Sequence, residues 1–396
     1  MRARLILYIS YDGLTDPLGQ SQVLPYLIAL SAQGYYFHIL SFEKEAAYQE
    51  NKSIIDKLTS DANIVWHGMN YHKSPPILST VYDSLRMKAI ATKLHAEFQF
   101  KAIWCRSYIP ALAGLYLKKR FRVPFIFDMR GFWPDERVEG GSWPQSNPVF
   151  RAVYRYFKQK EQLLLAEADH VVVLTNKAKE ILEMRQLHDN PVPKAISVVP
   201  CCVDSELFDP SRISVKQKSE ARAALGIGES ERVLVYAGSL GTWYMVREML
   251  EYFAGLSERT QGWKFLVLTK DNPEQLYRDA DELIVARKNI IVRSCKRAEM
   301  PLYLSLGDLA ISYIQPVFSK QASSPTKLAE YMAMGLPVVC SEGVGDVDKL
   351  MREAGLSDLK VSTKLGVAPF LRDFARNRFS LDVALKVYLE VLSLSD

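Results

Sequence analysis

The stretch from Ser323 to Ser341 (SSPTKLAEYMAMGLPVVCS) constrains the fold most, because it runs a short helix directly into a buried strand. Ser324 is a typical N-cap residue, and Pro325 suits the first helical position, where its missing N–H costs nothing. Gly335 stands where a left-handed residue ends a helix, and the apolar run at 336–340 predicts a short parallel strand. Such a junction is typical of α/β sheets.

The N-terminus of the predicted helix is a position where an anion can bind. Its free backbone N–H groups and the positive end of its dipole suit a phosphate. The residues concerned are Ser324, Pro325, Thr326 and Lys327. Glu330, one turn further along, can accept hydrogen bonds from sugar hydroxyls. A solvated face on an ordinary helix explains the same spacing, so both interpretations stay open at this point.

Strand-like and helical runs alternate along the whole chain. Short β-branched or aromatic runs occur at 4–10, 37–41, 102–105, 124–127 and 169–175, and again at 232–238, 266–270, 290–294 and 308–313. A chain of 396 residues is long enough for two hydrophobic cores. We therefore expect an α/β protein with two doubly wound Rossmann-like domains facing across a cleft. Their predicted bounds are 1–208 and 209–376, with a closing helix at 377–396 that crosses back toward the first domain.

Composition excludes several classes of protein. No window of 18 uninterrupted apolar residues predicts a transmembrane helix, and the N-terminus lacks a secretory pattern, so a cytoplasmic protein is expected. The five cysteines have no CxxC spacing and the six histidines no paired-ligand spacing, so we expect neither disulfides nor a metal site. A GxGxxG motif is missing, which argues against a dinucleotide-dependent oxidoreductase.

Positive charge is concentrated in one segment, although the net charge of the chain is only +5. Between Lys73 and Arg130 there are eleven Lys and Arg residues against three acidic ones. A surface of this kind attracts an anionic membrane, here its inner face, or a phosphorylated acceptor. A solvated helix end explains the charge equally well. Nucleic acid is not an expected partner, because no recognised module accompanies the charge.

The stretch Ser324–Ser341 resembles the donor-binding helix of the GT-B glycosyltransferases, most closely the retaining family 4, group 1. Members carry two glutamates separated by seven residues, followed by a small-residue helix end and Gly-x-Pro-Val-Val. Glu330 matches the second glutamate and Ala322 stands at the first, so the chain resembles a variant branch with half of the motif. The linker at 196–210 and the strand at 308–313 also follow the family order.

The resemblance implies that the second domain binds a nucleotide-sugar. In the family the residue matching Glu330 holds the ribose, and the strand end matching Arg293 holds the base. The family's cationic diphosphate clamp follows the glycine that matches Gly238, but here the next residue is Ser239. Two lysines are the candidates to replace that charge, Lys270 at a strand end and Lys327 near the helix start.

The resemblance further implies that the first domain binds the acceptor. Gly19 falls where family members carry a glycine pair facing the donor diphosphate. Arg106 stands at the strand end where members often place a histidine, and Asp128, Arg130 and Glu136 line the predicted acceptor side. Simple pairing of the aspartate with the neighbouring arginine is the alternative. The segment 132–148 is rich in Gly, Pro and Trp, so we predict an acceptor loop that contains no helix.

Together these expectations describe a glycosyltransferase of the hexosyltransferase class. It would move a sugar from a UDP- or GDP-linked donor to a hydroxyl of a polysaccharide, glycolipid or similar glycan precursor, with retention of configuration. Neither a cofactor nor a metal is expected. Two alternatives stay open, a catalytically silent nucleotide-sugar-binding subunit and a UDP-sugar epimerase of the same architecture.

Overall fold

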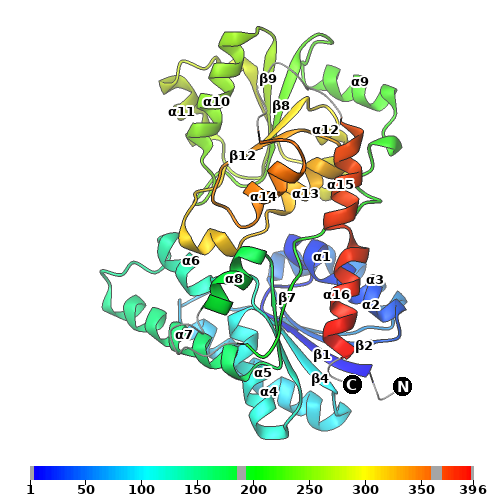
Figure 1. Ribbon diagram of the computed structural model, residues 1–396, viewed down its shortest axis with the longest axis vertical. Helices are drawn as coiled ribbons and strands as arrows, with labels where there is room; N and C mark the ends of the chain where they lie inside the picture. Colours follow the sequence, from blue (N-terminus) through cyan, green and yellow to red (C-terminus); the bar gives the residue numbers. More distant parts are fainter. Residues whose placement is uncertain (1–3, 185–192, 358–367, 394–396) are drawn as a thin grey trace. The chain divides into compact units, whose positions relative to one another are not determined.

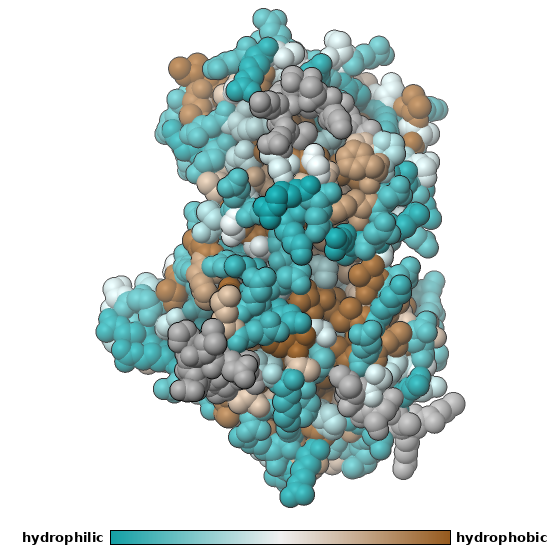
Figure 2. All heavy atoms as spheres, in the orientation of Figure 1, coloured by the Kyte–Doolittle hydropathy of each residue, from teal (hydrophilic) through white to brown (hydrophobic). Residues whose placement is uncertain are grey.

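The computed structural model describes residues 4–184, 193–357 and 368–393, and these form two compact α/β units (Figure 1). The first unit comprises Met1–Pro200 together with Leu381–Asp396, and the second comprises Cys201–Ser380. The first unit therefore contains both ends of the chain. On the face drawn in Figure 2, hydrophilic side chains cover most of each unit, and hydrophobic side chains form smaller patches.

The first unit is built on a seven-stranded parallel sheet with the strand order β3-β2-β1-β4-β5-β6-β7. Its strands are β1 (Leu5–Ser10), β2 (Tyr36–Glu43), β3 (Val65–Asn70), β4 (Ala102–Arg106), β5 (Phe125–Asp128), β6 (His170–Val173) and β7 (Ile196–Val198). The central strands are apolar and buried, as expected for a parallel sheet covered by helices. The strand order reverses between β1 and β4, and ligands of such sheets bind beyond the carboxyl ends of the strands at this point.

Nine helices belong to the described part of the first unit. They are α1 (Pro17–Gln22), α2 (Leu24–Ala32), α3 (Glu45–Asp61), α4 (Leu78–Phe98), α5 (Tyr108–Phe121), α6 (Trp133–Glu139), α7 (Pro148–Glu167), α8 (Asn176–Met184) and α16 (Leu381–Ser393). The last of these returns to the first unit, where Tyr388 packs against Tyr26 and Trp104, with ring centroids 5.6 and 4.8 Å away.

Helix α6 contradicts the prediction that segment 132–148 contains no helix. Pro134 stands in its first turn, where a missing N–H costs nothing, and Asp135 and Glu136 follow at the positive end of the helix dipole. The ring of Trp133 packs edge-on against Phe157 of α7, with centroids 4.9 Å apart. The Gly and Pro residues of this segment therefore argued against a short helix that tertiary packing stabilises.

The second unit is built on a five-stranded parallel sheet with the order β10-β9-β8-β11-β12. Its strands are β8 (Arg232–Ala237), β9 (Trp263–Leu268), β10 (Ile290–Arg293), β11 (Leu309–Ser312) and β12 (Val338–Cys340). Its helices are α9 (Val215–Ala224), α10 (Val246–Arg259), α11 (Glu274–Glu282), α12 (Met300–Leu304), α13 (Thr326–Ala333), α14 (Val347–Glu353) and α15 (Pro369–Phe379). Short 3-10 turns occur at Pro210–Arg212, Arg287–Asn289, Arg297–Glu299 and Phe318–Ala322.

Both faces of this second sheet are buried. Val233 and Val235 of β8 belong to one hydrophobic cluster, whereas Leu234 and Tyr236 belong to another. Because successive side chains of a strand point to opposite faces, helices must cover the sheet on both sides. Each unit is thus a parallel α/β layer structure, which confirms the predicted fold class. Among the described residues, no helix is both long and apolar enough to cross a membrane.

Candidate active site

The predicted donor-side residues gather at one edge of the second sheet. Gly238 directly follows β8, Lys270 follows β9, and Arg293 ends β10. Helix α13 lies between β11 and β12 in the chain, so its N-terminus follows a strand of the same sheet. Because all five strands are parallel, these positions share the carboxyl edge, where ligands of α/β sheets bind.

The start of α13 differs from the prediction in two respects, because neither Ser324 nor Pro325 occupies its predicted position. The helix begins at Thr326 with Pro325 at the cap position, and the structure records no side-chain cap there. Ser324, the predicted N-cap, is wrong in that role: its Oγ accepts a hydrogen bond from the backbone N–H of Cys201 at 3.1 Å. The hydroxyl is used to fasten the helix start to the linker. The N–H of Leu328 donates to the carbonyl of Pro325 at 3.0 Å, and the N–H groups before it, as in any helix, have no carbonyl four residues back within the helix.

Lys327, in the first turn of α13, is the most unusual side chain at this edge. It is buried, and its Nζ donates a hydrogen bond to the hydroxyl of Tyr236 at 3.1 Å. The ammonium also lies 4.3 Å from the ring centroid of Tyr236 and 3.8 Å from that of Tyr244. Burial lowers the pKa of Lys327 from 10.5 to about 7, although Glu330 opposes this shift. An aromatic cage therefore holds a cation that anions would stabilise.

Gly238 allows the backbone to approach this cation. Its φ is +145°, and a Cβ at this position would lie only 2.6 Å from the Nζ of Lys327. Any side chain here would displace the lysine. Tyr236 completes the contact, because its hydroxyl donates a hydrogen bond to the carbonyl of Ser239 while accepting one from Lys327. Glycine loop, tyrosine and lysine thus form one packed group.

Glu330, predicted to hold a ribose, is already engaged in the structure. Its carboxylate accepts a hydrogen bond from Nη1 of Arg297 at 2.9 Å. Burial raises the pKa of Glu330, and the charge of Arg297 opposes that rise. Sequence reasoning missed Arg297, which begins the first 3-10 turn after β10 and so lies at the same sheet edge. Its position shortly after a predicted strand is the sequence signal that could have identified it.

The remaining predicted donor residues make other contacts. Ser239 donates its hydroxyl hydrogen bond to Asp271 at 2.9 Å, and the N–H of Leu240 binds the same carboxylate at 2.7 Å. A carboxylate therefore stands beside the loop where the family motif has cations. Lys270, next to that aspartate, is exposed. Arg293 lies over the ring of Tyr303, 4.5 Å from its centroid.

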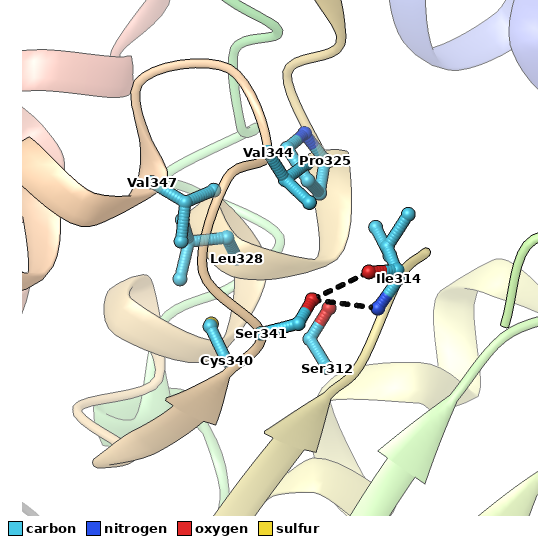
Figure 3. Close-up of a pocket in the computed structure, with 8 residues that line it drawn as sticks. All are labelled: Ser312, Ile314, Pro325, Leu328, Cys340, Ser341, Val344 and Val347. Atoms are coloured by element: carbon cyan, nitrogen blue, oxygen red, sulfur yellow. Dashed lines mark hydrogen bonds between the residues drawn. The ribbon is translucent and has the colours of Figure 1, made fainter. Parts of the chain in front are cut away.

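A small pocket opens beside the N-terminus of α13, at the ends of β11 and β12 (Figure 3). It is lined by Ser312, Ile314, Pro325, Leu328, Cys340, Ser341, Val344 and Val347. In Figure 3 the hydroxyl of Ser341 joins both backbone groups of Ile314, accepting from its N–H at 2.9 Å and donating to its carbonyl at 2.7 Å. The pocket walls are mainly apolar, and Pro325 is the one predicted site residue among those that line it.

In the first unit, the structure brings Arg106, Asp128 and Arg130 together at the ends of β4 and β5. Nη1 of Arg106 lies 3.8 Å from Oδ2 of Asp128, and Nη1 of Arg130 lies 3.7 Å from its Oδ1. All three side chains are buried. Burial raises the pKa of Asp128, and the two arginines oppose that rise. Pairing of Asp128 with Arg130 is the alternative interpretation of the sequence, and the structure contains this ion pair. Sequence reasoning missed Asp12, which lies 3.3 Å from Nε of Arg106.

Gly19 and Glu136 lie on separate elements of the same unit. Gly19 belongs to α1, where a Cβ would lie 2.1 Å from the carbonyl oxygen of Gly13. Close packing of α1 on the preceding loop is therefore sufficient to require glycine here, without any contact to a donor diphosphate. Glu136 stands in the first turn of α6 and is partly exposed. In the described part of the chain, no group of three or more His, Cys, Asp or Glu side chains is placed to hold a metal ion.

Two family profiles together match most of the chain. The profile of Glycosyltransferase Family 4 matches residues 22–207, and that of Glycosyl transferases group 1 matches residues 217–356. No curated protein matches the chain in sequence. The Glu330 region and the glycine after β8 both fall within the second matched segment.

Several solved structures share the fold across almost the whole chain. Sucrose-phosphate synthase from Thermosynechococcus elongatus has a TM-score of 0.69 at 14% identity and covers 99% of this chain and 100% of its own. Anabaena HepE in complex with UDP-glucose has a TM-score of 0.67 at 14% identity, with 98% and 99% coverage. UDP-GlcNAc 2-epimerase from Neisseria meningitidis reaches only 0.57 at 12% identity, with 99% coverage of each chain. The chain belongs to the GT-B glycosyltransferases of family 4, group 1.

Proposed function

We propose that this glycosyltransferase moves a hexose from a UDP- or GDP-linked donor to a hydroxyl acceptor, with retention of configuration. The observation that carries the donor half is the buried ammonium of Lys327, held under Gly238 at the N-terminus of α13. A cation, a helix N-terminus and a glycine that admits close approach together suit a diphosphate. The bound UDP-glucose of the Anabaena structure supports a nucleotide-sugar of this kind.

In this proposal the enzyme stabilises the negative charge that develops on the departing diphosphate. The first amides of α13 and the Lys327 ammonium are already in place before the reaction, so they require no reorganisation. Each preorganised donor of this type is worth about 3 kcal/mol of barrier lowering. Lys270 adds a second, exposed cation at the same sheet edge. The positive charge comes from side chains, and the proposed reaction needs neither a metal nor a cofactor.

Proton transfer in this proposal does not use a protein base. In front-face retention the leaving phosphate accepts the proton of the attacking hydroxyl. Asp128 is not assigned this role, because its buried carboxylate is paired with Arg106 and Arg130. We assign this cluster to shaping the acceptor side of the first unit, with Glu136 of the adjacent α6 as a further contact. The acceptor is a polysaccharide, a glycolipid or a lipid-linked glycan precursor.

A silent nucleotide-sugar-binding subunit is the second candidate, and two observations favour it. Ala322 stands at the first glutamate of the family motif, and Asp271 places a carboxylate on the loop after β8. An epimerase is less favoured, because the epimerase structures match with lower TM-scores than the glycosyltransferases.

A two-step experiment tests the proposal. The chain is first screened by thermal shift against nucleoside diphosphates and UDP- and GDP-sugars, where a ligand at a hundred times its Kd adds about 2.7 kcal/mol of stability. The stabilising nucleotide-sugar is then incubated with and without an acceptor panel, and products are identified by mass spectrometry and NMR. Transfer with retained anomeric configuration supports the proposal. Binding without turnover supports the silent subunit, epimerised donor without acceptor supports the epimerase, and no stabilisation by any nucleotide contradicts all three.

A further inference from the structure

Helix α4 presents an apolar stripe to solvent on its outer face. Leu78, Val81, Tyr82 and Leu85 are 67, 50, 53 and 61% exposed. Their spacing of three and four residues places them on one side of the helix. The next residue on that side, Ala89, is also exposed and carries no charge. A helix on the surface of a protein normally turns polar residues outward, so this stripe needs a partner.

The inner face of α4 is fixed, so the stripe cannot turn inward. Asp83 is buried and accepts hydrogen bonds from the hydroxyl of Tyr11 at 3.0 Å and from the N–H of His72 at 2.9 Å. Met87 and Leu94 are buried on the same side of the helix. The helix therefore already buries one apolar face against the first unit and exposes a second one.

Cations surround the exposed stripe. Arg86 follows Leu85 directly; its guanidinium lies 5.5 Å from the ring centroid of Tyr82, and its Nη1 lies 3.9 Å from a carboxylate oxygen of Asp83. Lys88 lies 3.8 Å from the ring centroid of Tyr116 on α5, which packs beside α4 (Figure 1). Further basic residues are Lys73 before the helix, Lys93 on its outer side, and Arg120, which donates to the hydroxyl of Tyr116 at 3.1 Å. The acidic residues of α4 are the buried Asp83 and Glu97 near the C-terminal end.

We propose that this face of α4 docks on an anionic lipid surface. The apolar side chains would enter the boundary between headgroups and acyl chains, and the flanking cations would contact lipid phosphates. A second copy of the chain fits less well, because symmetric pairing of the stripe would bring these cations against copies of themselves. The inference is independent of the proposed sugar transfer, since it rests on residues of the first unit that the donor site does not include.

Co-sedimentation of the full chain with lipid vesicles tests this inference. Vesicles of phosphatidylcholine and phosphatidylglycerol in equal parts are compared with phosphatidylcholine alone, at low and high salt. The natural chain should bind the anionic vesicles and lose binding as salt screens the phosphates. The double substitution Leu78→Ser and Leu85→Ser should lower the partition coefficient by roughly tenfold or more, because two exposed leucines no longer enter the lipid.

A matched control separates this face from exposed apolar residues in general. Ile284, in the second unit, is 92% exposed, and Ile284→Ser should bind vesicles like the natural chain. Thermal unfolding should be the same for all three proteins, which shows that the substitutions leave the fold intact. Equal binding to both lipid mixtures, or unchanged binding by the double variant, would overturn the proposal. A dimer in analytical ultracentrifugation that the double variant abolishes would overturn it in favour of self-association.

Discussion

Replacing Lys327 by methionine should move stability and ligand affinity in opposite directions. Burial lowers the pKa of this ammonium from 10.5 to about 7. A lowering of that size corresponds to about 5 kcal/mol against the charged form in the folded protein. Methionine keeps much of the side-chain volume and removes the charge. The variant also loses the hydrogen bond to Tyr236, which offsets part of the stabilisation. The ligand-free variant should therefore gain a net of roughly 1 to 4 kcal/mol of unfolding free energy at pH 6.

The pH dependence of this gain follows from the direction of the shift. Because the pKa of Lys327 is lower in the folded than in the unfolded chain, the unfolded chain binds more protons between about pH 7 and 10.5. The destabilisation is absent above that window, grows as the pH falls, and is complete below about pH 7. The stability gap between variant and natural chain should therefore shrink from pH 6 to pH 9. Urea denaturation measures it, with Lys349→Met, an exposed lysine on α14, as a control that changes little.

Ligand binding should respond with the opposite sign. A hydrogen bond to a charged group is worth about 1.5 to 3 kcal/mol, so Lys327→Met should weaken UDP or GDP binding by about 10- to 100-fold. A bound diphosphate stabilises the ammonium, so binding to the natural chain above pH 7 should take up protons. Calorimetry in two buffers with different protonation enthalpies measures this uptake. A variant that is less stable at pH 6, or that binds both nucleotides unchanged, would refute the reasoning.

Three further substitutions test the remaining parts of the site. Gly238→Ala places a Cβ 2.6 Å from the Nζ of Lys327 at a φ of +145°, so it should lower the unfolding free energy by roughly 1 to 3 kcal/mol in urea denaturation. Asp128→Asn removes the charge of the buried carboxylate that Arg106 and Arg130 both face and should cost roughly 3 to 5 kcal/mol by calorimetry; a neutral effect would show that water screens the cluster. Glu330→Ala should raise the donor KM by roughly 10- to 100-fold in initial-rate assays, and an unchanged KM would remove Glu330 from the site.

Local signals in the sequence predict the fold well. The helix at 326–333, the glycine after it and the strand at 338–340 follow from helical periodicity, a glycine at the helix end and an apolar run within one short stretch. The parallel arrangement follows from the alternation of strands and helices. Helix α6 was missed because its stability comes from packing of Trp133 on Phe157, which no local pattern reports.

The candidate site is less accessible from the sequence, because its contacts join distant parts of the chain. The hydroxyl of Ser324 accepts a hydrogen bond from the amide of Cys201, 123 residues away. The predicted N-cap residue therefore joins the start of α13 to the linker and does not cap the helix. Arg297 meets Glu330 across 33 residues, and Lys327 meets Tyr236 across 91. Residue types and strand ends place such side chains at a common edge, but only the folded chain decides which of them pair.

The return of the last helix to the first unit makes the second unit a continuous insertion in the chain. Its two ends meet, because the N–H of Val203 donates to the carbonyl of Phe379 at 2.8 Å and Val203 pairs in parallel with Ser380. Residues 201–380 are therefore a natural segment to excise, permute or join head to tail without stretching the backbone. Evolution can exchange this five-stranded unit as one piece while the seven-stranded unit stays the same.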